Sequence, residues 1–148
     1  MTLEILLEAG PLALLAHPRR SGPIEVWASD HFIAGNRVIV PEIAFYEVRR
    51  EVVRLRQQVS LERLDQLPAG FPYAPITTRI IVRATELWAQ ARRSGRPTAD
   101  PQALDTDVIL AATPLELTSQ ASDVVVATSN VGHLAQFVDA RPWQTITP

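Results

Sequence analysis

Two aspartates, Asp105 and Asp107, stand at the beginning of an apolar, alanine-containing segment that continues to Ala112. If Asp105 is the N-cap of a helix, Asp107 falls in the first turn, where unpaired backbone N–H groups and the helix dipole favour negative charge. Alternatively, Asp107 is a ligand for a hard cation, with Asp105 beside it. The choice depends on whether other acidic side chains reach the same place in the fold.

The strands and helices around these acids decide where they can meet. Short apolar runs bounded by turn residues predict strands at residues 3–7, 37–40 and 123–127, with a last strand at 143–146. Helical spacing and capping residues predict helices at 21–34, 41–59, 61–67 and 77–95, one that carries the two aspartates, and a short one around 134–138. Trp88 shares the apolar face of the helix at 77–95 and is expected in the core. The order of the elements predicts an α/β fold, a central parallel sheet flanked by helices, as one domain over residues 1–148.

Four oxygen-bearing side chains are expected at one edge of this sheet. Glu8 directly follows the first strand, and Asn130 follows the third. Because ligands of parallel α/β sheets bind at the carboxyl ends of the strands, both side chains would project from the binding edge. Glu47 and Asp107 lie on early turns of helices that can face them. Glu47 also has an ordinary explanation, as an intrahelical partner of Arg50.

The residue types at this edge indicate metal chemistry. A cluster of carboxylates repels itself unless a cation neutralises it, and Mg²⁺ or Mn²⁺ is the hard ion suited to carboxylate oxygens. Such an ion can activate a water molecule and polarise a phosphodiester. All 14 basic side chains are arginine, the better fork for phosphate. The arginines at residues 49–56 and 92–96 are explained either by solvated helix faces or by phosphate contacts.

Composition excludes several other classes of protein. The absence of cysteine excludes a disulfide framework, a thiolate metal site and a cysteine nucleophile, and the absence of lysine excludes a P-loop lysine and a Schiff base. With 47% apolar and 20% charged residues the chain is globular rather than disordered. No stretch approaches the ~20 apolar residues of a membrane span, and the N-terminus lacks signal-peptide features, so a cytoplasmic protein is expected.

In order and spacing, several segments together resemble the PIN-domain ribonucleases, a family that includes many bacterial toxins of toxin–antitoxin pairs. The segments that carry the resemblance are residues 6–11, 40–50, 87–89, 107–112 and 127–133, so it covers nearly the whole chain. The resemblance implies an acidic site at Glu8, Glu47, Asp107 and Asn130. It also makes Asp105 a secondary acid, with Thr128 as a supporting hydroxyl. It further implies Mg²⁺- or Mn²⁺-dependent cleavage of RNA and a homodimer.

One departure from the family concerns Glu8, because the first acid of the family is normally aspartate. The extra methylene moves the carboxylate, and active sites tolerate only ~0.5 Å of misplacement. If Glu8 is a lesion in an otherwise intact site, Glu8→Asp restores activity, and we favour this alternative because the rest of the constellation matches. If the site has been rebuilt around the longer side chain, the same change lowers activity. Asn130 is a lesser departure, since its amide carbonyl still coordinates Mg²⁺.

The sequence therefore indicates a metal-dependent endoribonuclease, with RNA, an antitoxin protein and a second copy of the chain as expected partners. Glu8, Glu47 and Asp107 would hold the ion, while Asp105 and Asn130 assist. The first alternative is a degenerate PIN-like domain that binds RNA or a partner protein without cutting. The second is an interaction domain whose acids are only helix caps. Distances among the acids distinguish a metal site from this last alternative, because the ligands of one Mg²⁺ ion bring their oxygens within ~4–5 Å of each other.

Overall fold

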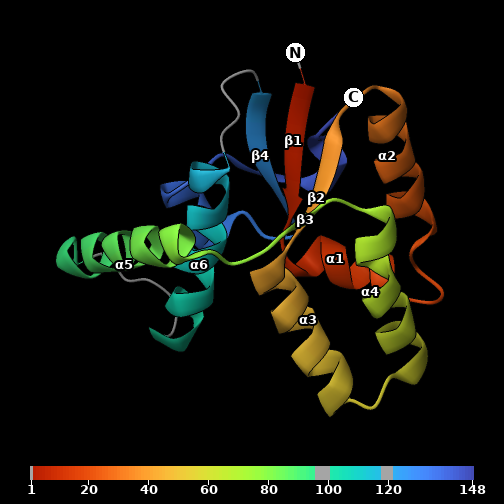
Figure 1. The fold of residues 1–148 in the computed structure, drawn as a ribbon, viewed down its shortest axis with the longest axis horizontal. Coiled ribbons are helices and arrows are strands. Elements are labelled where there is room, and N and C mark those ends of the chain that lie inside the picture. The colour runs from red at the N-terminus through yellow and green to blue at the C-terminus, as the bar shows by residue number, and fades with distance from the viewer. Residues whose placement is uncertain (1, 96–100, 118–121) are drawn as a thin grey trace.

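The computed structural model describes residues 2–95, 101–117 and 122–148, and its centre is a five-stranded sheet in the order β3-β2-β1-β4-β5 (Figure 1). Every neighbouring pair of strands is parallel. The strands are β1 (Thr2–Leu7), β2 (Arg37–Pro41), β3 (Tyr73–Ala74), β4 (Ser122–Thr128) and β5 (Ala140–Pro142). The expected α/β architecture with a parallel sheet is confirmed.

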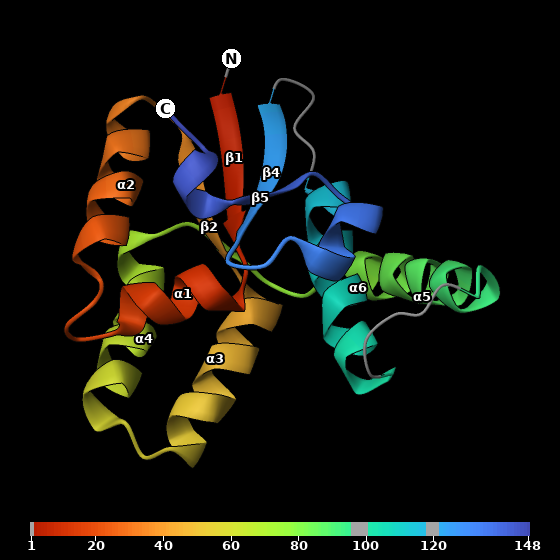
Figure 2. The same ribbon diagram turned by 180° about the vertical axis from the view of Figure 1, so that it is seen from behind.

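In the described part of the chain, six α-helices surround this sheet. They are α1 (Ala9–Ala16), α2 (Gly22–Ile33), α3 (Glu42–Arg54), α4 (Gln58–Gly70), α5 (Thr78–Arg93) and α6 (Pro101–Glu116). Two short 3₁₀ helices follow at Gly132–Gln136 and Trp143–Thr145. Figures 1 and 2 show α1, α2 and α4 on one side of the strands and α5 and α6 on the other. No helix within these described ranges has the length and apolarity needed to cross a membrane.

Successive side chains of β1 point to opposite sides of the sheet, and both sides are buried. Ile5 and Leu7 belong to a core that includes side chains of α1, α2, α3 and α4. Leu6 belongs to a second core on the other face, where it joins Leu110 of α6. With ladders to β2 and β4 on its two sides, β1 is buried from both faces and both edges. The end of this central strand is therefore the most firmly held point of the binding edge.

Helix α5 packs on α6 rather than on the sheet. Its Ile80, Ala84 and Leu87 form a third apolar cluster with α6 side chains. Thr77 caps the helix, because its side chain accepts a hydrogen bond from the Ile80 N–H at 3.2 Å. The expectation for Trp88 is wrong: its side chain is 39% exposed, at the border of the buried stripe.

Three expected boundaries differ from the structure. Two helices were expected at 41–59 and 61–67, but the boundary between them lies earlier, because Arg56 adopts a left-handed conformation with φ of 55°, so that α3 ends at Arg54 and α4 begins at Gln58. The expected last strand at 143–146 is instead a 3₁₀ turn that follows β5. Helix α6 begins at Pro101, so Asp105 is not its N-cap and Asp107 lies beyond its first turn. Helix capping therefore does not explain the two aspartates.

Candidate active site

Glu8 occupies the junction between β1 and α1. Its backbone N–H donates to the carbonyl of Ala127 at 2.9 Å and so extends the β1–β4 ladder by one residue. Its own carbonyl accepts from the Leu12 N–H at 3.1 Å, since Glu8 is the N-cap residue of α1. The side chain makes no capping bond. Both backbone groups of Glu8 are therefore hydrogen-bonded, and its carboxylate is not used in capping the helix.

The carboxylate of Glu8 is held by residues that follow β4. The buried Thr128 hydroxyl and the Ser129 backbone N–H both hydrogen bond to it. Thr128 Oγ1 also lies 2.9 Å from the Asn130 carbonyl and accepts the Asn130 N–H at 2.9 Å. A hydroxyl has one proton to donate, so an ionised Glu8 competes with the Asn130 carbonyl for it. Thr128 thus connects two residues of the predicted site, as the resemblance implied for its hydroxyl.

Gly10 allows the loop after β4 to approach α1 closely. A Cβ at this position would lie 2.6 Å from Ser129 Oγ and 3.0 Å from Ser129 Cβ, closer than side chains pack. The approach matters because the Ser129 N–H is one of the donors to Glu8. Gly10 and Ser129 were not among the residues predicted for the site. The glycine two residues after an acidic strand end was the only signal for this contact.

Glu47 lies in the second turn of α3 and is half-buried. Burial raises the pKa of Glu47 to about 7, the charge of Arg50 opposes the increase, and the charges of Asp107 and Glu8 add to it. The Glu8 pKa is also raised, first by burial, while hydrogen bonds from Thr128 and Ser129 oppose the shift. Asp107 raises the Glu8 pKa as well. The three acids therefore act on one another although they come from β1, α3 and α6.

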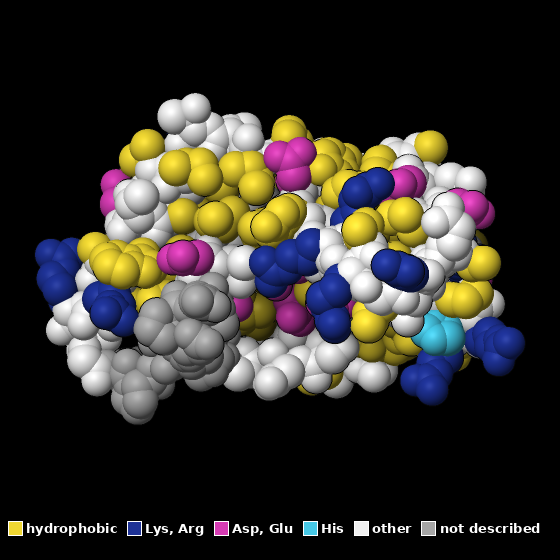
Figure 3. Space-filling model, turned by 90° about the horizontal axis from the view of Figure 1, so that it is seen from below, with side chains coloured by type: hydrophobic (Ala, Val, Ile, Leu, Met, Phe, Trp, Pro, Cys, Tyr) yellow, Lys and Arg dark blue, Asp and Glu magenta, His cyan; other side chains and the backbone are white. Residues whose placement is uncertain are grey.

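The face of the molecule at the carboxyl ends of the strands gathers these charges. Figure 3 shows it from below the view of Figure 1: acidic side chains are recessed near its centre, with arginine side chains beside them. Arg49 is engaged by Asp65, through contacts of 2.9 and 3.2 Å to its two carboxylate oxygens. Arg50 is the cation whose charge acts on Glu47. The site is thus a recessed group of acids with a basic border.

Asp105 is not brought to this group. Two residues along an α-helix correspond to a rotation of about 200°, so Asp105 and Asp107 point to nearly opposite sides of α6. Asp105 is exposed and lines a mainly apolar cleft of about 350 Å³ with side chains of α5, including Ile81 and Trp88. Its predicted role as a secondary acid has no support from its position.

Asn130 is exposed at the end of the loop after β4. Its backbone is tied to Thr128, and its side-chain oxygen lies near Gly132, where a Cβ would come within 3.1 Å of it. Asn130 therefore shares the Thr128 connection with Glu8. The side chain of His133, three residues after Asn130, lies outside the described part of the structure.

The chemistry of these side chains fits a hard divalent cation. Burial, together with the charges of the neighbouring acids, raises the pKa values of Glu8 and Glu47, and the carboxylates of Glu8, Glu47 and Asp107 are the oxygen donors that Mg²⁺ and Mn²⁺ prefer. In the described part of the chain, however, no three acidic or histidine side chains are already gathered as ligands of one ion. Binding an ion would therefore require the carboxylates to turn toward one another.

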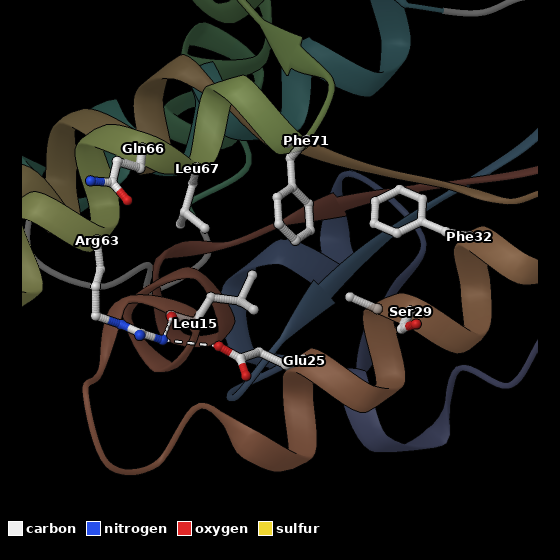
Figure 4. Close-up of a pocket in the computed structure, with 10 residues that line it drawn as sticks. Leu15, Glu25, Ser29, Phe32, Arg63, Gln66, Leu67 and Phe71 are labelled. Carbon is white, nitrogen blue, oxygen red and sulfur yellow. Dashed lines mark hydrogen bonds and ion pairs between the residues drawn. The ribbon is translucent and has the colours of Figure 1, made fainter.

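A separate groove of about 410 Å³ lies between α2 and α4 and contains none of the predicted site residues. Figure 4 shows Leu15, Leu67, Phe32 and Phe71 around it, with Arg63 reaching across. The Arg63 guanidinium donates to the Glu25 carboxylate at 2.9 Å. This groove is chemically distinct from the acidic edge, being mainly apolar with one ion pair.

Comparison with solved structures identifies the fold. VapBC2 from Rickettsia felis, in a structure bound to a promoter DNA fragment, matches with a TM-score of 0.68 and 12% identity over 95% of this chain and 99% of the other. FitAcB from Neisseria gonorrhoeae matches with a TM-score of 0.65 and 21% identity over 96% and 99%. VapBC-1 from nontypeable Haemophilus influenzae gives 0.66 and 15% over 97% and 100%. No protein-family model and no curated protein sequence matches the chain.

These matches extend over the whole length of both chains, and the matched chains are PIN-domain proteins of the VapC and FitB type. The present chain therefore has the PIN-domain fold, and the resemblance found in the sequence is confirmed at the level of the fold.

Proposed function

We propose that this chain is a metal-dependent endoribonuclease that acts as the toxin of a toxin–antitoxin pair. One observation carries the proposal: Glu8, Glu47 and Asp107, from three separate elements, act electrostatically on one another at the carboxyl edge of a PIN-domain sheet. Acids that only cap or solvate helices have no reason to converge in this way, whereas the ligands of a hard cation must converge. The PIN-domain fold of known toxins supports the same assignment.

In this mechanism Glu8, Glu47 and Asp107 would hold Mg²⁺ or Mn²⁺ through carboxylate oxygens, and Asn130 would contribute its amide carbonyl. A bound ion supplies Lewis-acid polarisation of the phosphodiester and a more acidic water. Hydrolysis adds the water oxygen to phosphorus and breaks a P–O bond, and the leaving oxygen takes up a proton. Thr128 and the Ser129 N–H orient the Glu8 carboxylate. Arg50 would contact the phosphate.

The same comparison supports an antitoxin protein as a partner. FitAB has been solved bound to an IR36 DNA fragment, and VapBC2 from Rickettsia felis bound to its promoter DNA. We propose that this chain likewise pairs with an antitoxin protein and forms a homodimer. Light scattering of the purified chain tests the homodimer, and a monomeric mass at micromolar concentration would contradict it.

The alternative is a PIN-like domain that binds RNA or a partner protein but does not cut. The observation that favours it is Glu8, which replaces the aspartate of the resembled family. The two functions differ in one measurement. A degenerate domain leaves RNA intact in Mn²⁺ and still binds it in chelator, whereas the nuclease shortens RNA only when the ion is present.

The experiment is therefore incubation of structured and single-stranded RNA with the purified chain, in Mn²⁺ and in chelator. Asp107→Asn should reduce cleavage by at least about 100-fold, because removing a metal ligand removes stabilisation of the developing charge. Asp105→Asn is the matched control on the same helix and should change cleavage less than about two-fold, roughly 0.4 kcal/mol of barrier. Equal cleavage by wild type and Asp107→Asn would remove Asp107 from the site.

A further inference from the structure

A cleft of about 510 Å³ runs along α3 beside the acidic edge. Its lining combines aromatic rings with arginines: Phe45, Tyr46, Arg49, Arg50, Val53 and Tyr73. One acid, Glu42, also lines it, and its carboxylate accepts hydrogen bonds from the Tyr73 hydroxyl and the Ile76 N–H. It adjoins the acids because Tyr46 immediately precedes Glu47 in α3, and the charge of Arg50 lowers the Glu47 pKa against the effect of burial. Exposed rings together with arginines are the combination that binds unpaired nucleotides.

Tyr46 and Arg50 form a platform within this cleft. They are one helical turn apart, and the Arg50 guanidinium lies 5.2 Å from the centroid of the Tyr46 ring. The Tyr46 side chain is 54% exposed, so its ring is accessible from solvent. A flat ring supported by a planar cation offers a base a surface on which to stack, and every base has a face that can use it.

The two arginines of the cleft differ in their availability. Arg49 is held in a two-contact ion pair with Asp65. The ion pairs found among the described residues include none for Arg50. Arg50 stands between the Tyr46 ring, which it contacts, and Glu47, on which its charge acts. Its positive charge is complementary to a phosphate that enters between the platform and the acids.

We propose that Tyr46 and Arg50 form a subsite for one unpaired nucleotide of single-stranded RNA, next to the phosphodiester that the acidic site would cleave. This inference rests on the proposed ribonuclease function. The base stacks on the Tyr46 ring, and Arg50 contacts the phosphate that follows. Bases inside a duplex are already stacked on their neighbours and cannot enter such a cleft. The subsite therefore selects single-stranded over double-stranded RNA.

The test is binding of labelled RNA by fluorescence anisotropy in chelator, where cleavage does not interfere. The probes are a short single strand, the same strand without bases at its central positions, and a duplex of equal length. Tyr46→Ala should weaken binding of the intact single strand about ten-fold, and Tyr46→Phe should retain it, because phenylalanine keeps the ring. Wild type and Tyr46→Ala should bind the abasic strand with equal affinity. Arg50→Ala should weaken binding of both single strands and reduce its dependence on salt.

Helix α5 supplies matched controls. Trp88 and Arg92 repeat the arrangement, with the Arg92 guanidinium 5.4 Å from the Trp88 ring centroid and the ring 39% exposed. Trp88→Ala and Arg92→Ala remove the same kind of pair elsewhere on the surface and should leave RNA affinity within about two-fold. Because Tyr46 and Arg50 are exposed, their variants should keep the wild-type melting temperature.

Unchanged binding of the intact strand by Tyr46→Ala would overturn the subsite and leave a protein segment as the occupant of the cleft. An equal loss on intact and abasic strands would also overturn it, since the base would then play no part. Cleavage in Mn²⁺, measured in parallel, separates this inference from the proposed function. Cleavage without any effect of Tyr46 refutes the subsite alone, and binding that depends on Tyr46 without cleavage refutes the hydrolysis alone.

Discussion

The Glu8 carboxylate is surrounded by groups that suit its length. It receives hydrogen bonds from the Thr128 hydroxyl and the Ser129 N–H, and both donors come from the segment that begins at the end of β4. Thr128 is fully buried and also bonds to the Asn130 backbone, so its hydroxyl has little freedom to follow a retreating carboxylate. These contacts support a site built around glutamate rather than a lesion, although the sequence alone favours the lesion.

We therefore expect Glu8→Asp to lower RNA cleavage, by about ten-fold or 1.4 kcal/mol of barrier. The shorter side chain loses reach toward Thr128 and leaves that buried hydroxyl with the Asn130 carbonyl as its remaining acceptor. Charge is unchanged, so long-range electrostatics do not contribute to the difference. Initial rates for wild type and Glu8→Asp at the same Mn²⁺ concentration decide the question. A rise in rate would show that aspartate is the better ligand here and that Glu8 is the lesion.

At the scale of elements, the contact between α1 and the loop after β4 sets the position of one donor to Glu8. Gly10→Ala would place a methyl group 2.6 Å from Ser129 Oγ and 3.0 Å from Ser129 Cβ, so Ser129 must shift to relieve the clash. We expect destabilisation of roughly 1–3 kcal/mol, as for overpacked positions, together with loss of cleavage. Thermal melting and RNA cleavage measure the two effects.

Gly70→Ala, at the end of α4, is the matched control, because nothing lies within 4 Å of the added carbon. It should be neutral or slightly stabilising, since alanine restricts the unfolded chain more than glycine. If Gly10→Ala has the same melting temperature and RNA cleavage rate as Gly70→Ala, the close approach of Ser129 to Gly10 contributes neither to stability nor to cleavage.

Apolar runs and capping residues were sufficient to predict most of the elements that build the edge, but not α1 (Ala9–Ala16), for which no helix was expected. The strands β1, β2 and β4 and the helices α2 and α5 lie within one or two residues of their expected bounds, since each has a clear hydrophobic pattern with turn residues at its ends. The break between α3 and α4 was expected several residues too late, because Arg56 takes a positive φ where no glycine or proline marks it. Strand β3 was not predicted, because it has only two residues and lies in a proline-rich segment that favours a loop.

The same reasoning explains how much of the site was predicted. The rule that ligands bind at the carboxyl ends of parallel strands brought Glu8, Glu47 and Asp107 together, and the structure places their charges in one neighbourhood. Asp105 was grouped with Asp107 because they are close in sequence. On a helix that starts at Pro101, however, they face opposite sides. The donor role of Ser129 depends on loop geometry, which a hydrophobic pattern does not encode.

For the whole molecule, the acidic edge makes stability depend on pH. The pKa values of Glu8 and Glu47 are raised in the folded state, that of Glu47 from 4.5 to about 7. A raised folded pKa means that the unfolded chain releases these protons first. The destabilisation is therefore absent below the unfolded pKa near 4.5 and grows as pH rises through about 7. Above that pH the folded protein carries the full repulsion among its acids unless a cation offsets it.

We therefore expect Mn²⁺ or Mg²⁺ to stabilise the protein at about pH 8 and much less at about pH 5, where protons compete with the ion for the carboxylates. An ion present at about 100 times its Kd contributes about 2.7 kcal/mol, or roughly 5–10 °C in melting temperature for a chain of this size. Thermal melting with metal and with chelator at both pH values measures this. Asp107→Asn should remove most of the shift, whereas Asp30→Asn, an exposed acid on α2, should keep it. Equal melting temperatures with metal and chelator at both pH values would show that the acidic edge does not bind these ions.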